Sequence, residues 1–380
     1  VLGVEKTTSN IKANTHIAID GDEGKVYVSP DSHTIEEKAE KIEHINEAKA
    51  VFIRELDLPA VTTDGHEIKI ASNIELPDEV KLMQKYNSQG IGLFRTELLY
   101  MAGKEFPQED LQTMIYSKVI RQCRGEQVII RTFDIGGDKF SDSFEHHLEP
   151  NPFLGWRAIR IGIDYPHLLN TLIIAILLSV AVGPCSIMFP MVSSITDIQF
   201  AKSIVDQAIT ELQNENAVFD PNVPVGIMIE VPAAAIIADR IAPYVDFMSI
   251  GTNDLIQYTM AADRGNEKVA KWYRTYHPAH LELIKRTIDA GHLHGIWVGM
   301  CGGMASKLLA IPFLIGLGID ELSVNPSQIP LVKAIVRRVS FTDARTIAEK
   351  SMLLPTHEQV EDYLRHEAER LLPETALNFI

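Results

Sequence analysis

The segment from Val225 to Ile250, VGIMIEVPAAAIIADRIAPYVDFMSI, decides the fold class of this 380-residue chain. It opens with a run rich in β-branched residues at Val225–Val231, continues through a helical stretch at Ala233–Ile241, and closes with a second run at Phe247–Ile250. Two strands joined through a helix form a parallel β-α-β unit. The segment therefore predicts an α/β protein with a parallel sheet.

The same alternation continues on both sides of this unit, with helical patterns such as Asp78–Tyr86, Ile195–Gln213 and Leu281–Ala290 between the strand-like runs. Eight β-α repeats over roughly 300 residues match the size and order of a (β/α)8 TIM barrel. A doubly wound open sheet is the alternative, but no G-x-G-x-x-G fingerprint opens a helix in this sequence. The predicted strands are Ile68–Ile74, Gly90–Arg95, Val128–Ile135, Ser186–Val192, Val225–Val231, Phe247–Ile250, Ile296–Met300 and Glu321–Val324.

The first residues of the chain read as a fragment. His16–Asp20 and Lys25–Ser29 alternate apolar and polar residues around a glycine-containing turn, which predicts a β-hairpin. Thirty-odd residues are too few to bury a core of their own. We expect the hairpin either to pack on the next domain or to be the tail of a domain that lies upstream.

A charged amphipathic helix follows the hairpin. Thr34 begins it, Glu37 completes a capping box, and apolar residues at helical or heptad spacing continue to about Leu56. We interpret it as a linker, although an ordinary surface helix of the main domain is the alternative. The predicted domains are a remnant at 1–33, a helical linker at 34–58 and the barrel at 59–380.

Composition narrows the classes of partner. The net charge of −16 disfavours nucleic acid and anionic membrane surfaces. Three scattered cysteines argue against a disulfide scaffold or a zinc ribbon and suit a reducing cytosol. The apolar stretch Leu168–Val182 is about 15 residues, which is shorter than the roughly 20 that span a bilayer. We predict an inward-facing helix there, and a cytoplasmic protein.

Charged and polar side chains gather where the predicted strands end, and in a TIM barrel these ends form one rim. A single arginine there is explained as readily by a structural salt bridge as by function. Several cations together with carboxylates on one rim of an acidic chain favour function. The set comprises Arg95, Arg131, Asp134, Lys139, Glu230, Asn253, Asp254 and Cys301, with Arg157 and Arg264 in loops just downstream of strands.

These residue types suit a small polyanionic ligand. Arginine side chains bind phosphate and carboxylate oxygens in a planar fork. Glu230 and Asp254 offer hard oxygen ligands of the kind that Mg²⁺ prefers, and a bound metal would neutralise charge during phosphoryl transfer. Alternatively, Glu230 pairs with a neighbouring arginine and has a structural role.

Cys301 lies in Gly299-Met-Cys-Gly-Gly303, where the glycines allow the backbone to approach a ligand closely. The thiol can serve as a general acid or as a nucleophile. A buried, inert cysteine is the alternative. The strand-end position and the glycine flanks favour a catalytic role.

Several long strings in the barrel region resemble Enzyme I of the bacterial phosphotransferase system. They extend from about residue 59 onward, and the first thirty-odd residues resemble the last part of that family's phosphohistidine domain. The strings are Gly92–Glu97 (GLFRTE), Arg131–Lys139 (RTFDIGGDK), Asn151–Arg157 (NPFLGWR), Glu230–Ala234 (EVPAA), Ile250–Leu255 (IGTNDL), Asp263–Asn266 (DRGN) and Gly299–Gly302 (GMCG).

The resemblance implies a phosphoenolpyruvate-protein phosphotransferase, in which phosphoenolpyruvate gives its phosphoryl group to a histidine and pyruvate is released. By this analogy Glu230 and Asp254 bind Mg²⁺, and Cys301 protonates the methylene carbon of enolpyruvate. The family also forms a homodimer through its barrels, and its phosphohistidine domain docks a histidine-containing carrier protein. The residues implied in holding phosphate and carboxylate oxygens are Arg95, Arg131, Lys139, Asn253 and Arg264, with Arg157 close by.

The chain departs from the family in three places, one of which is the uncharged stretch Leu168–Val182, and the other two bear on function. Its phosphohistidine string is missing, because the Ser-His-Thr around His33 lacks both flanks, so the accepting histidine is expected outside this chain, which we expect to be truncated. Gly303 stands where the family usually has an acidic residue after Gly-Met-Cys-Gly. These departures leave a non-catalytic phosphoenolpyruvate sensor or scaffold as one alternative. A relative of pyruvate phosphate dikinase or phosphoenolpyruvate synthase is another, although those enzymes need a nucleotide-binding domain and no glycine-rich phosphate loop occurs in this sequence.

Overall fold

Eight parallel strands close into a barrel in the computed structural model, which describes residues 11–21, 24–101, 106–136 and 149–377. The barrel closes where the last strand pairs with the first, at Glu321–Val324 against Lys69–Ser72. The TIM barrel predicted from the sequence is therefore confirmed. In order around the barrel the strands are β10 (Glu321–Val324), β3 (Lys69–Ile74), β4 (Ile91–Phe94), β5 (Val128–Arg131), β6 (Cys185–Phe189), β7 (Val225–Ile229), β8 (Phe247–Ile250) and β9 (Trp297–Met300).

Each strand is shorter than the apolar run that predicted it, or equal to it. Val128–Ile135 contains a strand that ends at Arg131, and Val225–Val231 contains one that ends at Ile229. The remaining residues of these two runs leave the sheet at its carboxyl end. This is why Asp134 and Glu230 lie in rim loops and not within the barrel wall.

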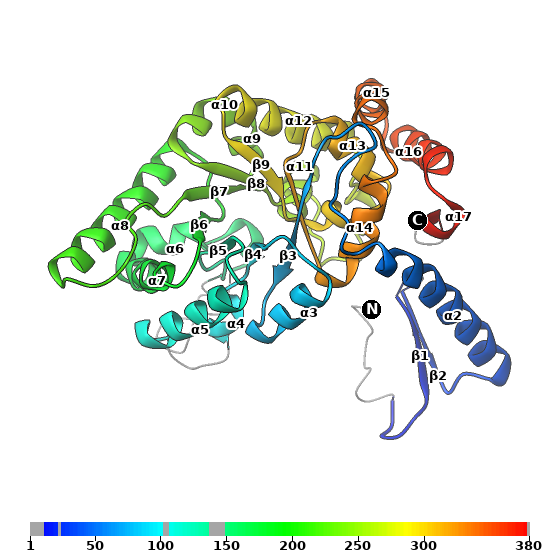
Figure 1. Cartoon of the computed structure of the whole chain (residues 1–380), viewed down its shortest axis with the longest axis horizontal. Coiled ribbons are helices and arrows are strands. Elements are labelled where there is room, and N and C mark those ends of the chain that lie inside the picture. The colour runs from blue at the N-terminus through cyan, green and yellow to red at the C-terminus, as the bar shows by residue number, and fades with distance from the viewer. Residues whose placement is uncertain (1–10, 22–23, 102–105, 137–148, 378–380) are drawn as a thin grey trace.

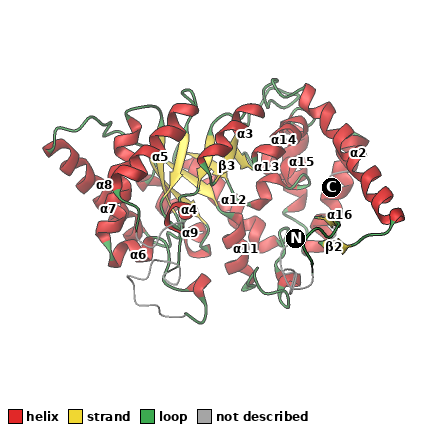
Figure 2. Cartoon of the chain, turned by 90° about the horizontal axis from the view of Figure 1, so that it is seen from below, coloured by secondary structure: helices red, strands yellow, loops and turns green. Residues whose placement is uncertain are grey.

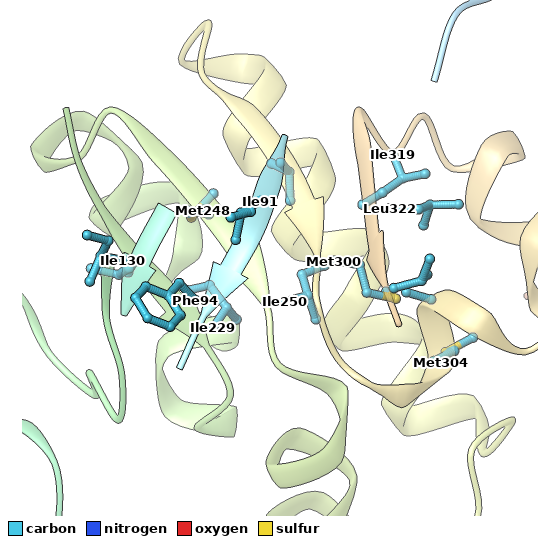
Figure 3. Packing of buried hydrophobic residues seen from close by; sticks show 14 of the residues in the cluster. Ile91, Phe94, Ile130, Ile229, Met248, Ile250, Met300, Met304, Ile319 and Leu322 are labelled. Atoms are coloured by element: carbon cyan, nitrogen blue, oxygen red, sulfur yellow. The ribbon is translucent and has the colours of Figure 1, made fainter. Parts of the chain in front are cut away.

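Two hydrophobic clusters share the strands between them, because successive side chains of a strand point to opposite faces. Ile130 and Ile229 belong to the large cluster, which packs between the strands and the surrounding helices (Figure 3). Ile129 and Met228, their chain neighbours, belong to a smaller cluster that also includes Cys301. The smaller cluster fills the interior of the barrel, which is how side chains fill TIM barrels in general.

Helices surround the strands (Figure 2). The longer ones are α5 (Glu109–Gln122), α7 (Pro166–Val180), α8 (Ile195–Asn214), α11 (Thr252–Met260), α12 (Pro278–Leu293), α14 (Ile329–Val336), α15 (Phe341–Ser351) and α16 (His357–Leu371). The shorter α-helices are α3 (Val80–Lys85), α4 (Glu97–Met101), α6 (Ile159–Asp164), α9 (Pro232–Ile236), α10 (Ala238–Ile241), α13 (Ala310–Gly316) and α17 (Glu374–Leu377). The 3₁₀ turns are η1 (Pro77–Glu79), η3 (Pro152–Leu154), η4 (Ala242–Tyr244), η5 (Ala270–Trp272), η6 (Gly303–Ser306) and η7 (Pro326–Gln328).

The uncharged helix α7 faces inward, as its sequence predicts. It packs between α5 and α8, and ten of its fifteen residues are buried. A helix that is covered on most sides carries apolar residues nearly all round. Within the described residues, no helix combines the length and the apolarity needed to cross a membrane.

The hairpin predicted at the start of the chain is present as β1 (Ile17–Asp20) and β2 (Lys25–Val28), beside the long helix α2 (Ser32–Arg54) (Figure 1). Asp20 is buried and forms ion pairs of 3.1 Å with both Lys38 and Lys41 of α2. The hairpin is thus tied to this helix. The predicted N-terminus of the helix was two residues late, since it begins at Ser32, where the Asp31 side chain accepts a hydrogen bond from the backbone N–H of Thr34.

The end of α2 is fastened to α14 of the barrel domain. Phe52 is buried in the large cluster, and the Glu55 carboxylate forms ion pairs of 3.1 Å with Arg337 and Arg338. The Nζ of Lys333, itself buried, donates hydrogen bonds to the carbonyl oxygens of Leu56 at 3.1 Å and Asn87 at 2.9 Å. One lysine therefore joins the helix end, α14 and the loop after α3.

The buried imidazole of His280 makes the stability of the fold sensitive to acid. Burial lowers the pKa of His280 to about 4, and its Nδ1 lies 2.8 Å from the carbonyl oxygen of Thr275. Between pH 6.5 and pH 4 the unfolded chain binds a proton at this histidine and the folded chain does not. The free energy of unfolding therefore falls by about 3 kcal/mol from this group as the pH drops from about 7 to about 4.

Urea denaturation of the wild type and of His280→Gln across this pH range measures the effect. The variant should lose this part of the pH dependence, whereas His294→Gln, which replaces an exposed histidine near the same helix, should retain it. Equal pH slopes for the wild type and His280→Gln would contradict the assignment.

Candidate functional site

A cavity of about 570 Å³ lies at the carboxyl-terminal rim of the barrel. Met228 and Leu93, which belong to the smaller cluster, also line this cavity. The floor of the cavity is therefore apolar, and its walls are charged. Rim loops after different strands contribute to it, as in other TIM-barrel sites. The charged and polar residues that line it are Glu75, Arg95, Glu97, Arg131, Asp134, Arg157, Glu230, Asn253, Asp254, Arg264 and Cys301.

Three carboxylates meet in this cavity: one oxygen of each of Asp134, Glu230 and Asp254 lies within 4.8 Å of the others. Glu230 directly follows β7, Asp254 lies in the first turn of α11 after β8, and Asp134 follows β5. The sequence predicts Glu230 and Asp254 as a pair of metal ligands. The structure brings this pair together and adds Asp134, which the sequence analysis left without a role.

Glu230 is 1% exposed, and its Oε1 accepts a hydrogen bond from the backbone N–H of Met191 at 2.7 Å. Burial, together with the nearby carboxylates of Asp134 and Asp254, raises the pKa of Glu230 well above its ordinary value. Among the described residues no arginine nitrogen lies within 4 Å of Glu230, so the alternative of a structural ion pair is not supported.

The three carboxylates fit a hard divalent cation. The buried Oδ1 of Asp254 accepts no hydrogen bond from the described residues, and its ion pair with Arg264 is long, at 3.5 Å. An unsatisfied buried oxygen beside two further carboxylates is the donor set that Mg²⁺ or Mn²⁺ binds in proteins. The structure therefore supports a cation site formed by these three carboxylates.

Asp134 connects two arginines. The Arg157 Nε and one terminal nitrogen donate to its Oδ1 at 2.9 and 2.6 Å, and an Arg131 nitrogen lies 3.0 Å from its Oδ2. Burial alone would raise the pKa of Asp134, but Arg131 and Arg157 outweigh it and hold the pKa below its ordinary value. A second nitrogen of Arg131 donates to Glu97 at 2.8 Å. Both guanidinium groups are thus fixed in place by carboxylates.

The remaining predicted ligand-binding residues occupy the outer part of the cavity. Arg95 forms an ion pair with Glu75, and the Arg264 side chain is 38% exposed above the ring of Phe153. Asn253 accepts a hydrogen bond at its Oδ1 from the backbone N–H of Gly303 at 2.9 Å, which leaves its Nδ2 as the group that can donate to an anion. Lys139 lies outside the described residues.

Cys301 follows β9 and lines the same cavity from its floor. Burial raises the pKa of its thiol to about 11, although Ser249 and Arg131 act in the opposite direction. Two hydrogen bonds fix the backbone of Cys301. Its N–H donates to the carbonyl oxygen of Ile250, and the Asn73 side chain donates to the carbonyl oxygen of Cys301 at 3.0 Å. At neutral pH the residue is therefore a protonated thiol in a fixed position.

The charges of the cavity do not balance for an anionic ligand alone. Four arginines face five carboxylates among the described lining residues. Each of Glu75, Glu97, Asp134 and Asp254 lies within ion-pair distance of an arginine, and burial beside two carboxylates raises the pKa of Glu230. The arginines of the lining are thus already offset by its carboxylates. A cation beside a ligand with several negative charges would add the positive charge that the lining does not supply.

Sequence reasoning missed four residues of the site. Glu75 and Glu97 partner Arg95 and Arg131, and Tyr258 receives a hydrogen bond from Arg157 at 3.2 Å. Glu97 lies in the string GLFRTE, two residues after Arg95. An acidic residue so close to a rim arginine could have been predicted to line the same site. Phe153, which lies below two guanidinium groups, gave no chemical signal.

We expect divalent-cation affinity at this site to rise with pH, because burial and the two neighbouring carboxylates raise the pKa of Glu230, so a proton competes with the cation there. Calorimetric titration of Mg²⁺ or Mn²⁺ in two buffers of different ionisation enthalpy should show proton release. Glu230→Gln mimics the protonated carboxyl, so it should leave stability nearly unchanged and weaken cation binding at least tenfold.

Glu282→Gln, an exposed position on α12, serves as the control and should bind the cation like the wild type. Cation binding by Glu230→Gln with wild-type affinity would show that the three carboxylates are not the site.

Comparison with known proteins found a matching family model and relatives that carry the name phosphoenolpyruvate-protein phosphotransferase. Residues 49–341 match a family model described as "PEP-utilising enzyme, PEP-binding domain". The phosphoenolpyruvate-protein phosphotransferase of Haemophilus influenzae is 39% identical over 378 residues, covering 100% of this chain and 65% of the relative.

Two further relatives carry the same name. That of Buchnera aphidicola is 41% identical, covering 96% of this chain and 65% of the relative, and that of Staphylococcus carnosus is 40% identical, covering 95% and 63%. This chain therefore spans about 65% of the length of these relatives.

Proposed function

This chain belongs to the PEP-utilising enzymes through their PEP-binding domain, and on that premise we propose that it is the phosphoenolpyruvate-binding part of a phosphoenolpyruvate-protein phosphotransferase. The proposed reaction moves the phosphoryl group of phosphoenolpyruvate to a histidine outside this chain and releases pyruvate. The observation that carries the proposal is one cavity that combines fixed arginines, three carboxylates and a protonated thiol.

Phosphoenolpyruvate presents a phosphate and a carboxylate on a three-carbon frame. We assign Arg95, Arg131 and Arg264 to these oxygens, with the amide nitrogen of Asn253 as a further donor. Arginine suits this task because its planar fork matches both anions. Arg157 lies in the same cavity, but two of its nitrogens are already directed at Asp134, so we assign it to holding that carboxylate. Lys139 remains a candidate from the sequence.

We propose Mg²⁺ as the cation, held by Glu230 and Asp254, with Asp134 as the third carboxylate of the set. When bound, the cation neutralises the phosphate and carboxylate charges that meet there. Burial raises the pKa of Glu230, so a proton would compete with the cation there, whereas Arg131 and Arg157 hold the pKa of Asp134 below its ordinary value.

Cys301 is the proposed acid. When the phosphoryl group departs, enolpyruvate remains, and its methylene carbon must gain a proton to become pyruvate. A thiol whose pKa is about 11 is protonated at neutral pH, and its place on the apolar floor keeps it away from bulk water. The ordinary pKa of an exposed cysteine would leave a fraction of it as thiolate, which cannot supply the proton.

The proposal extends to partners outside the described cavity. The accepting histidine, the histidine-containing carrier protein and a homodimer through the barrel are all implied by the resemblance to Enzyme I. A non-catalytic sensor remains the second candidate, because Gly303 stands where the Enzyme I family usually has an acidic residue. The experiments below separate the two.

Calorimetric titration of phosphoenolpyruvate, with and without Mg²⁺, is the first test. We expect binding that requires Mg²⁺ and that is lost in Glu230→Gln but not in Glu282→Gln. Adding an isolated phosphohistidine domain from a relative should then produce pyruvate if the chain is the enzyme part. Binding without pyruvate would favour the sensor, and no binding under either condition would refute the proposed function.

Replacing the thiol of Cys301 separates binding from proton transfer. Cys301→Ala should bind phosphoenolpyruvate within about threefold of the wild type, because the arginines and the cation hold the ligand. Pyruvate formation in the complemented reaction should fall by about 100-fold or more, which is the usual contribution of a positioned general acid. Coupled lactate dehydrogenase measures pyruvate, and an undiminished rate would exclude Cys301 as the acid.

A further inference from the structure

A polar bridge inside the barrel reaches the backbone of Cys301. Asn73 of β3 and Ser323 of β10 form it. Both side chains point inward, because their chain neighbours Ile74 and Leu322 belong to the large cluster outside the strands. The Ser323 hydroxyl donates to Oδ1 of Asn73 at 2.7 Å, and Nδ2 of Asn73 donates to the carbonyl oxygen of Cys301 at 3.0 Å. Since β10 lies between β3 and β9, the bridge joins β3, β10 and the end of β9.

The two partners of the Asn73 amide fix its orientation. A carbonyl oxygen has no hydrogen to donate, so the amide nitrogen faces Cys301 and the amide oxygen faces Ser323. Ser323 is 1% exposed, and its hydroxyl therefore donates from within the barrel. Turning the amide over would place two oxygens against each other at Cys301. The pair of hydrogen bonds thus holds one end of the amide on the carbonyl.

Gly92 leaves room for this bridge. The pairing of β3 with β4 passes over Gly92, which lies beside Ser323. A Cβ at Gly92 would lie 2.5 Å from the Ser323 hydroxyl oxygen and 2.6 Å from its Cβ, which is closer than side chains approach each other. Ser323 is paired with β3 at this point, so its backbone is fixed there. The glycine that opens the string GLFRTE is therefore needed for the place that Ser323 takes.

The bridge meets Cys301 where the regular sheet ends. β9 pairs with β8 and with β10 as far as Met300, and Cys301 is the next residue. The residues that follow, Gly303 and Met304, donate their N–H groups to side chains of α11. The chain around the thiol is thus held by α11 after Cys301 and by Asn73 at Cys301 itself.

The sulfur of Cys301 depends on this backbone for its place. The hydrogen bond that the thiol donates, to the carbonyl oxygen of Ile250, is long at 3.9 Å. A peptide group that turns out of position carries the attached Cα, Cβ and Sγ with it. A misplacement of about 1 Å at a reacting group costs about 100-fold in rate. A side chain that fixes the carbonyl of Cys301 therefore bears on any reaction of the thiol.

We propose that Asn73 is a positioning residue for the phosphotransfer reaction: through the carbonyl oxygen of Cys301 it holds the thiol where the methylene carbon of enolpyruvate receives its proton, and Ser323 fixes the amide that does so. This role rests on the proposed function. In the step concerned the S–H bond of Cys301 breaks and a C–H bond forms at the methylene carbon. The enolate oxygen becomes the ketone oxygen of pyruvate, and the thiolate regains a proton from water. Asn73 and Ser323 exchange no atoms in this step.

Asn73→Leu tests the role, because leucine has a similar size, lacks the donor and adds no charge. In the complemented reaction the turnover rate of pyruvate formation should fall about tenfold, while the calorimetric Kd of phosphoenolpyruvate with Mg²⁺ stays within about threefold of the wild type. Ser323→Ala keeps the donor but frees its orientation, so it should slow turnover about threefold. Asn222→Leu, an exposed position before β7 at the amino-terminal end of the barrel, is the control and should match the wild type.

A double-mutant cycle with Cys301→Ala separates positioning from a general loss of structure. If Asn73 acts through the thiol, Asn73→Leu should slow the Cys301→Ala enzyme no further. A second loss of about tenfold on that background would show that Asn73 supports something other than the thiol, and would overturn the proposal. Wild-type turnover in Asn73→Leu, or a loss of affinity that accounts for the whole loss of rate, would overturn it as well.

The hydrogen bond can also be measured without ligand, so that the geometry and the function are tested separately. Labelling the carbonyl carbons of the three cysteines with ¹³C gives three signals in the full chain, and Cys301→Ala identifies the one from Cys301. That signal should move upfield in Asn73→Leu, and an unmoved signal would overturn the proposal. Ser323→Ala, the smaller change, carries both tests if Asn73→Leu does not fold. Failure of the wild type to bind phosphoenolpyruvate would refute the proposed function and the role in the reaction together, whereas the carbonyl shift would still show that Asn73 holds Cys301.

Discussion

The position of Asp134 between Arg131 and Arg157 is the interaction on which the rest of the site depends. Two guanidinium groups buried close together would repel each other, and neither would be stable there without a counter-charge. The carboxylate satisfies both, and its remaining capacity faces Glu230 and Asp254. One side chain thereby belongs to the anion-binding half and to the cation-binding half of the cavity. The arrangement lets these buried charges offset one another within the lining of the cavity.

Burial acts on two other groups in the same direction and gives them different uses. Glu230 and Cys301 are both buried, and burial raises the pKa of each, that of Cys301 to about 11. Glu230 has two carboxylate neighbours, which together form a set of oxygens that could hold a divalent cation. Cys301 lies against Met228 on an apolar floor. The same physical effect therefore supports both proposed roles, Glu230 as a ligand of a cation and Cys301 as an acid.

The fold was predictable because every strand carries its own local signal. Runs such as Val225–Val231 are β-branched and apolar, and eight of them in alternation with helices leave few other architectures. The same alternation predicts that Glu230, Asp254 and Cys301 share one rim, because each follows the end of a strand. Asp134 could not be assigned in this way, because its role depends on two arginines that approach it from a different loop and from its own strand. The side chain of Phe153 gave no chemical signal, since an aromatic ring contributes to a site only in relation to its neighbours.

Helix α2 contacts α14 at its carboxyl-terminal end and the hairpin nearer its amino-terminal end. The helix has 23 residues, which at about 1.5 Å per residue makes an arm of about 35 Å. Its base is pinned to α14 by Lys333, Glu55 and Phe52, and its far end carries the hairpin through Asp20 (Figure 1). A tilt of about 10° at such a base would carry the far end by about 6 Å over that length. The position of the hairpin is therefore set by a handful of contacts at the base of α2, on the outside of the barrel and at a distance from the cavity.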